Sequence, residues 1–175
     1  MTREDQFRNA VNESRDHIFR ICNYYFDDAG DRDDAFQESL IRIWQALPSF
    51  RGNSKMSTWI YRIVVNTCLS YFRSEKKRKL FLVMDPPDQF AATETETKPE
   101  MDEIREKKLR FFHDFLKTLS AVDRSLVSLY LEEVGTHEIA DITGLSEVNV
   151  RVRIHRIKET IKKRWEEKNN GTRRF

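Results

Sequence analysis

Apolar residues recur every three or four positions through residues 4–79, a spacing that places them on one face of a helix. The first stripe predicts a helix over residues 4–26 and runs through Phe7, Val11, Ser14, Ile18, Ile21 and Tyr25. A second stripe stops at Pro48, because proline cannot continue the hydrogen-bond ladder of a helix. It contains Phe36, Leu40, Ile43, Trp44 and Leu47. After a loop over residues 49–55, a third helix carries Trp59, Ile63, Thr67 and Tyr71.

Residues 85–103 break this pattern. They contain three prolines, seven acidic residues, one basic residue and almost no aliphatic side chains. Such a segment cannot bury enough apolar surface to offset the entropy that it would lose on ordering. We therefore predict a flexible acidic linker between two helical domains.

Helical periodicity resumes near Ile104. The next helix has a strongly apolar face, made of Phe111, Phe112, Phe115, Leu116 and Leu119. Ser120 with Asp123 resembles a capping box at the start of another helix. The core face of that helix holds Leu126, Val127, Tyr130 and Leu131. We expect Gly135 to end it and Thr136 to cap a short helix that follows.

The segment from Thr136 to Lys163 has the pattern of a helix-turn-helix, with a short helix, a glycine turn and a longer helix. Ala140 is small where the two helices would cross closely, and Gly144 permits a left-handed backbone in the turn. Ser146 is expected to cap the longer helix. The buried side of that helix is lined by Val150, Ile154, Ile157, Ile161 and Trp165.

Together these elements predict an all-α protein of two small helical domains, the second containing the helix-turn-helix. We place the first domain at residues 1–80, the linker at 81–103, the second domain at 104–168 and a disordered tail at 169–175. The composition agrees, since 5 Gly and 4 Pro among 175 residues leave room for few turns.

Charge is distributed unevenly, although the formal net charge is only +2. Residues 27–38 contain six acidic residues and one basic residue. Residues 62–79 contain six basic residues and one acidic residue, and residues 151–164 contain seven and one. An acidic patch and two basic helical stretches indicate one electronegative and one electropositive contact surface.

Several functional classes are disfavoured by the sequence. The four histidines are far apart, and neither a metalloprotease motif nor a glycine-rich phosphate loop is present, so we expect no enzymatic activity, cofactor, metal or small-molecule substrate. Cys22 and Cys68 lie on apolar helix faces and are interpreted as buried free thiols. The first residues lack the apolar core of a signal peptide, and no apolar run approaches the ~18 residues that would span a bilayer. We expect a cytoplasmic protein.

The exposed face of the last helix carries basic side chains that suit the major groove of DNA, where arginine reads guanine with two hydrogen bonds. These side chains are Arg151, Arg153, His155, Arg156 and Lys158. The alternative is a solvated basic helix in a helical bundle.

Aromatic and basic residues alternate between residues 49 and 79, a combination that suits unstacked single-stranded bases. They include Phe50, Trp59, Tyr61, Tyr71 and Phe72 with Arg51, Lys55, Arg62 and Arg73. The alternative is that most of these rings belong to the core. The acidic second helix, with Asp33, Asp34, Gln37 and Glu38, is by itself also typical of an ordinary solvated helix face.

Three stretches taken together resemble the extracytoplasmic function sigma factors, a branch of the sigma-70 family. They are DDAFQESLIRIW, FRGNSKMSTWIYRIVVN and HEIADITGLSEVNVRVRIHRIK. The resemblance covers Phe7 to Trp165, nearly the whole chain. It implies an alternative sigma factor with two helical domains and a linker, which binds core RNA polymerase, recognises promoter DNA and initiates transcription of a regulon.

The resemblance also implies residue roles. The candidates for docking on the beta-prime clamp helices are Asp33, Asp34, Gln37 and Glu38. The candidates for the downstream promoter element, including a pocket for a flipped base, are Phe50, Arg51, Asn53, Lys55, Met56, Arg62 and Asn66. The candidates for the upstream element are Asn149, Arg151, Val152, Arg153, His155, Arg156 and Lys158. Further implied partners are the beta flap of the polymerase and an anti-sigma factor, possibly membrane-bound, while the linker would thread toward the RNA exit channel.

Three positions depart from the family pattern. Met56 stands where phenylalanine is usual, and it can pack in the same place. Ser70 stands where aspartate is common, so no role is carried over to it. His155 occupies a variable position, which leaves its base preference open.

The main rival is a simple helix-turn-helix repressor or activator. It would explain the second domain, but it leaves the acidic helix, the aromatic and basic stretch and the linker without a purpose. A repressor binds its operator alone, whereas a sigma factor depends on polymerase.

Overall fold

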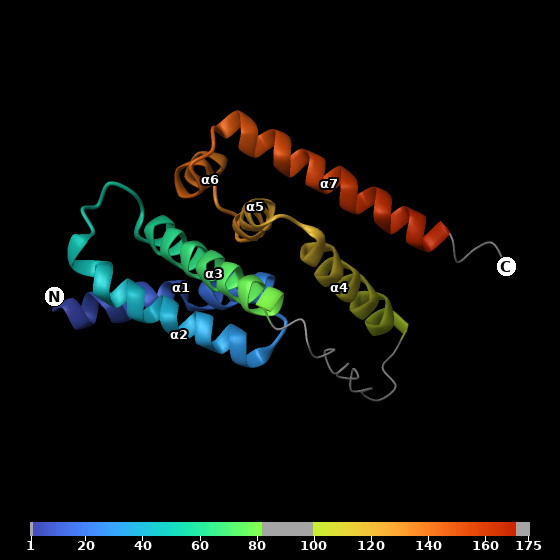
Figure 1. The fold of residues 1–175 in the computed structure, drawn as a ribbon. Helices are drawn as coiled ribbons and strands as arrows, with labels where there is room; N and C mark the ends of the chain where they lie inside the picture. The colour runs from blue at the N-terminus through green and yellow to red at the C-terminus, as the bar shows by residue number, and fades with distance from the viewer. Residues whose placement is uncertain (1, 82–99, 171–175) are drawn as a thin grey trace.

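A computed structural model describes residues 2–81 and 100–170, and within these ranges the protein is entirely helical (Figure 1). The helices are α1 (Arg3–Tyr25), α2 (Ala29–Ala46), the short 3₁₀ helix η1 (Leu47–Ser49), α3 (Met56–Phe81), α4 (Glu100–Thr118), α5 (Ala121–Leu131), α6 (Thr136–Thr143) and α7 (Glu147–Asn170). The predicted all-α class is confirmed.

Helices α1, α2 and α3 pack against one another and form the first domain. The first two apolar stripes predict Ile18, Ile21 and Ile43, and all three are fully buried. In α3 the fully buried positions include Ile60 and Val64, each one residue beyond the expected Trp59 and Ile63, which are only partly buried. Helix α1 begins with a capping box between Thr2 and Asp5, and the Asp28 side chain caps α2 by accepting from the Asp31 N–H at 3.0 Å. Local sequence signals therefore set both helix starts.

Helices α5, α6 and α7 pack together in the second domain, and α4 lies against α7. Phe115 and Leu116 of α4 form a small core with Val127 and Ile157, and Phe111 makes an edge-on ring contact with Trp165. The predicted start of α5 is confirmed, because Ser120 Oγ accepts from the Asp123 N–H at 3.1 Å.

Three expected boundaries differ from the structure. Helix α3 extends to Phe81, and helix α4 begins at Glu100. The expected linker of 81–103 therefore overlaps a helix at each end. Its residues 82–99 lie outside the part of the chain that the structure describes. Helix α7 continues to Asn170, so residues 169 and 170 are helical rather than part of a tail; 171–175 are not described. The N-cap of α6 is Gly135 rather than Thr136. Helix α5 ends before Gly135, at Leu131, and the residue with a left-handed backbone after it is Glu133, with a φ of 58°.

The two domains pack against each other through α1 and α3 on one side and α4, α5 and α6 on the other (Figure 1). Tyr25 Oη lies 2.7 Å from Ser125 Oγ, and the Arg124 guanidinium donates to the Tyr25 carbonyl at 3.3 Å while lying over the Phe72 ring. One buried apolar cluster contains residues of both domains. Sequence periodicity carries no information on this contact.

Cys22 and Cys68 are both fully buried, with their sulfur atoms 3.9 Å apart, and both are free thiols as predicted. Among the described helices, none has both the length and the apolar character needed to cross a bilayer.

Candidate polymerase and nucleic-acid interfaces

Helices α6 and α7 form the predicted helix-turn-helix. Gly144 ends α6 with a φ of 73°, the left-handed conformation that glycine adopts without strain. Ser146 Oγ accepts from the Asn149 N–H at 3.3 Å and so caps α7. Val150 is fully buried against the rest of the domain, which fixes the rotation of α7 about its own axis. That rotation decides which side chains can reach DNA.

Six of the seven predicted upstream-element residues are exposed on α7, and Arg153 is half-buried. The exposed residues are Asn149, Arg151, Val152, His155, Arg156 and Lys158. Arg151 donates to Glu147, one turn earlier on α7, at 2.9 Å. Such a surface ion pair is weak, so a DNA base could take the place of Glu147 as the acceptor. This face is long enough to place several side chains at base edges.

Arg153 and Lys158 have partners within the domain. Arg153 Nε donates to Asp123 of α5 at 2.9 Å, and Lys158 Nζ donates to the Tyr130 hydroxyl at 3.2 Å. Arg153 is half-buried against α5, whereas Lys158 remains exposed beside it.

Sequence reasoning missed Val148, which is 66% exposed at the start of the same face. It lies one turn before Val152, and the two form an apolar strip beside the arginines. Apolar side chains in the major groove can contact the thymine methyl group. The sequence signal that could have identified Val148 is its spacing of four residues from Val152, which places both on one face of a helix.

A pocket of about 390 Å³ lies between the loop before α3 and helix α6. It is lined by Ser49, Phe50, Arg51, Asn53, Ser54, Trp59, Arg62 and Asp141. Four of the predicted downstream-element residues therefore meet in one place. Phe50 packs against Trp59 with the ring centroids 5.2 Å apart and the ring planes tilted by 54°, which gives the pocket an aromatic wall.

The other three downstream candidates lie outside this lining. Met56 packs against the core, as expected for a residue in the position of a phenylalanine. Asn66 is exposed on α3, one helical turn beyond Arg62. Lys55 is exposed at the end of the loop, where its Nζ lies 3.2 Å from Glu138 of α6.

The acidic face of α2 is exposed where the sequence predicts a polymerase contact. Asp33, Asp34 and Gln37 are exposed, and Glu38 accepts from Arg42 at 2.7 Å. Ile41, which sequence reasoning missed, is 51% exposed on this face. An exposed aliphatic residue one turn beyond Gln37 and Glu38 is the type of side chain that anchors a protein interface.

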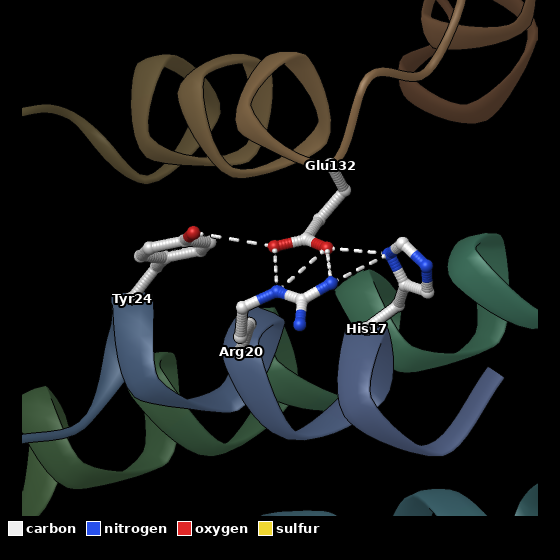
Figure 2. Close-up of polar contacts among 4 residues, drawn as sticks. All are labelled: His17, Arg20, Tyr24 and Glu132. Carbon is white, nitrogen blue, oxygen red and sulfur yellow. Dashed lines mark hydrogen bonds and ion pairs between the residues drawn. The ribbon is translucent and has the colours of Figure 1, made fainter.

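A cluster of polar side chains joins the two domains, and it was not predicted (Figure 2). Glu132, at the end of α5, accepts from Arg20 Nη2 at 2.8 Å and from Arg20 Nε at 3.0 Å. The same carboxylate accepts from the Tyr24 hydroxyl at 3.2 Å, and His17 Nδ1 lies 2.6 Å from it. We call these four residues the Glu132 cluster. Only the spacing of His17, Arg20 and Tyr24 on one face of α1 could have suggested a binding surface.

The electrostatics of this cluster follow from burial. The side chain of Glu132 is 1% exposed, so its charge depends on its partners for stabilisation. Burial and the nearby Glu132 charge raise the pKa of Tyr24 to about 12, so the Tyr24 hydroxyl remains protonated and donates. The hydrogen bond to Glu132 also raises the pKa of Arg20 above its already high value.

Helix α6 makes a second polar contact with the first domain, at the downstream-element residues. Glu138 accepts from Thr58 Oγ1 at 2.8 Å, and Arg62 Nη2 donates to the Asp141 carbonyl at 2.9 Å. Burial opposes ionisation of Glu138, but hydrogen bonds from Thr58 and Lys55 outweigh it and lower its pKa. Glu138 therefore remains an anion in contact with Lys55.

No group of three or more His, Cys, Asp or Glu residues is placed to hold a metal ion within residues 2–81 and 100–170. The interfaces described above can bind a protein or a nucleic acid.

Comparison with known proteins agrees with this geometry. The pattern of Sigma-70 region 2 matches residues 10–78, and that of Sigma-70 region 4 matches residues 112–161. The ECF RNA polymerase sigma-E factor of Salmonella typhimurium is 32% identical over 145 residues, which cover 76% of this chain and 73% of that protein. The chain belongs to the ECF sigma factors. Its relatives also include the ECF RNA polymerase sigma factor SigW of Bacillus subtilis, 25% identical over 173 residues, or 91% of this chain and 89% of SigW.

Solved structures share the fold of this ECF sigma factor. The sigma factor RpoE in complex with the anti-sigma factor NepR from Bartonella quintana aligns with a TM-score of 0.72 at 17% identity, over 90% of this chain and 95% of that one. CnrH in complex with the cytosolic domain of CnrY aligns with a TM-score of 0.68 at 18% identity, over 94% and 90%. Sigma factors initiate transcription and are not enzymes, as the sequence predicts for this chain.

Proposed function

We propose that this ECF sigma factor docks on core polymerase through α2, binds the downstream promoter element through α3 and its preceding loop, and binds the upstream element through α7. The observation that carries the proposal is the exposed basic face of α7 on a helix-turn-helix whose rotation is set by buried Val150. The pocket at Phe50 and Arg62 and the exposed acidic face of α2 support the other two contacts. The protein would act in the cytoplasm, where core polymerase is found.

The direct test adds purified protein to core polymerase on fragmented genomic DNA and sequences the 5′ ends of the transcripts. We expect a set of start sites with shared upstream and downstream elements. The matched control is the Arg156→Ala variant, which should lose most of these starts while keeping its helix content by circular dichroism. If start sites match those of core polymerase alone, the proposal fails. If the protein binds a specific DNA site without polymerase, the result would instead indicate a simple helix-turn-helix repressor or activator.

We further propose that an anti-sigma factor controls this protein, possibly a membrane-bound one. The support is that the structural neighbour RpoE was solved with the anti-sigma factor NepR, and the neighbour CnrH with the cytosolic domain of CnrY. A genetic two-hybrid screen should yield a partner that abolishes the transcripts in the reconstituted reaction at a one-to-one ratio. A partner that binds but leaves transcription unchanged would contradict this proposal.

A further inference from the structure

The outward face of α7 is apolar at its centre, close to the start of the helix. Val148 is 66% exposed and Val152 is 41% exposed, whereas Val150 between them is fully buried. Because successive residues of a helix are turned by about 100°, a residue two positions from Val150 on either side lies about 160° from it. Val148 and Val152 therefore point away from the core, one turn apart, and form the apolar strip.

The candidates for polar base contacts lie on both flanks of the apolar strip. Arg151 is turned about 100° from Val150 in one direction, and Arg156 is turned about 120° from it in the other. Both arginines are exposed. When such a helix enters the major groove, its central outward residues face the base edges and its flanks face the bases and phosphates on either side. The apolar strip is therefore the part of α7 that would meet the floor of the groove.

The surface around the apolar strip fits DNA better than it fits an apolar protein partner. Residues 151–158 contain four basic residues and no acidic residue, so the strip lies within a positively charged surface that complements a polyanion. Among the described residues, Val148 belongs to neither of the two apolar clusters. Capping does not require it either, because Ser146 Oγ caps α7 by accepting from the Asn149 N–H. The fold thus gives no reason for a valine at position 148.

The base edges in the major groove include one methyl group, that of thymine, beside hydrogen-bond donors and acceptors. A valine packed against the methyl group buries apolar surface on both partners. A valine packed against a donor or acceptor removes its water without replacing the hydrogen bond, which costs free energy. Val148 therefore favours thymine both by attraction to the methyl group and by rejection of polar base edges.

We infer that Val148 is a specificity-determining residue of the upstream-element contact, and that it recognises the C5 methyl group of a thymine. This inference rests on the proposed binding of the upstream element by α7. Val152 contacts a second thymine methyl group. The two valines are about 6 Å apart along the helix axis, which corresponds to between one and two base-pair steps of about 3.4 Å.

The test removes the methyl group from the DNA without changing the base pair. The probes are fluorescent duplexes of a promoter mapped by the transcript sequencing, in which deoxyuridine replaces each thymidine of the upstream element in turn, on either strand. Deoxyuridine keeps every hydrogen-bonding group of thymidine and lacks only the C5 methyl group. Holoenzyme made with the full-length protein is titrated against each duplex by fluorescence anisotropy. All other promoter contacts are the same in every probe, so they cancel in the ratio of affinities.

The wild-type holoenzyme should bind about three- to fourfold more weakly when the thymine that contacts Val148 loses its methyl group, since one buried group of this size contributes about 0.8 kcal/mol. Val148→Ser should bind the thymidine and deoxyuridine duplexes equally at that position. It should keep its sensitivity at the thymine that contacts Val152, which shows that α7 still docks, and Val152→Ser should behave conversely.

The matched control is Val122→Ser, because Val122 is an exposed valine at the second position of α5, as Val148 is of α7. This variant should show the same deoxyuridine effects as the wild-type protein. A further probe restores the methyl group on another base. Cytosine in place of the thymine that contacts Val148 should weaken binding, and 5-methylcytosine should recover about three- to fourfold for the wild type and nothing for Val148→Ser.

Three results would overturn the inference. They are equal binding of thymidine and deoxyuridine duplexes by the wild-type holoenzyme at every position, an equal methyl effect in the wild type and Val148→Ser, and an upstream element without any A·T pair.

The arginine variants separate this failure from a failure of the proposed function. If Arg151→Ala and Arg156→Ala alter the preference for upstream sequences while removal of methyl groups has no effect, α7 binds the element and the inference alone falls. If neither these variants nor any base change in the upstream element alters binding, the assignment of α7 is wrong, and the inference falls with it.

Discussion

Glu132 accepts a hydrogen bond from Arg20 at 2.8 Å although 112 residues separate them in the sequence. The two side chains differ strongly in exposure, at 1% for Glu132 and 46% for Arg20. The contact therefore stabilises the two charges unequally. The buried carboxylate depends on it, whereas the guanidinium can be solvated without it.

This inequality predicts the relative effects of two substitutions. Arg20→Ala leaves a buried carboxylate with only His17 and Tyr24, and we expect it to lower the free energy of unfolding by about 2–4 kcal/mol. Glu132→Ala leaves Arg20 free to reach water, so its cost should be smaller. Urea denaturation followed by circular dichroism measures both, with Arg15→Ala as an exposed control on the same helix. A larger loss for Glu132→Ala would contradict the argument.

The acidic face of α2 should determine the affinity for core polymerase. Reversing charge with Asp34→Lys and Glu38→Lys should weaken holoenzyme formation by about tenfold or more, because like charges would then face the binding surface. Ile41→Ala should weaken it as well by removing an apolar contact. Binding to core is measured by fluorescence anisotropy of labelled protein, with Glu13→Lys on the exposed side of α1 as the control. Unchanged affinity in the double reversal would exclude this face.

The arginines of α7 should differ in their effect on promoter choice. Arg151→Ala and Arg156→Ala should each relax preference at one base position and cost about 1–3 kcal/mol on the preferred sequence. Arg153→Ala breaks the ion pair with Asp123 instead, and should lower stability by about 0.5–1 kcal/mol while leaving the preferred sequence unchanged. Selection from randomised upstream elements by each holoenzyme tests this. Loss of preference with Arg153→Ala alone would show that α7 is turned differently on DNA.

Promoter melting should depend on the exposed side of α3. Asn66→Ala should lower open-complex formation at a mapped promoter more than closed-complex binding, since holding an unstacked base offsets a cost of a few kcal/mol. Permanganate footprinting reports the melted bases, and Ser70→Ala, one turn further along α3, serves as the control. Normal melting in the Asn66 variant would remove this residue from the site.

The helix-turn-helix should carry a pH-dependent contact. A hydrogen bond to Glu147 and the nearby Asp141 charge raise the pKa of His137 above its usual 6.5. The stabilising pair of His137 with Glu147 is therefore fully present below pH 6.5, and it is lost as pH rises through the raised pKa. Nuclear magnetic resonance titration of the His137 ring should show the upward shift, and Glu147→Gln should reduce it. A His137 midpoint unaffected by that change would contradict the assignment.

The sequence by itself determined the helices, most of their caps and the helix-turn-helix, because these depend on contacts within a few residues. Val150, Ile154 and Ile157 repeat with the helical period, and that repeat already turned Arg151 and Arg156 outward. The order of the motifs along the chain also indicated the family, because that order can be read without knowing which residues meet in space.

Only the tertiary structure decided which polar groups meet across the chain. Periodicity places Arg153 nearer than Arg156 to the edge of the exposed face, but only the position of α5 places Asp123 beside Arg153. Likewise, nothing within a few residues of Glu132 indicates that its carboxylate is buried against α1. Helix-forming signals act within one segment of the chain. The burial and pairing of a charge depend instead on how two domains pack against each other. That packing also places α6 against Arg62.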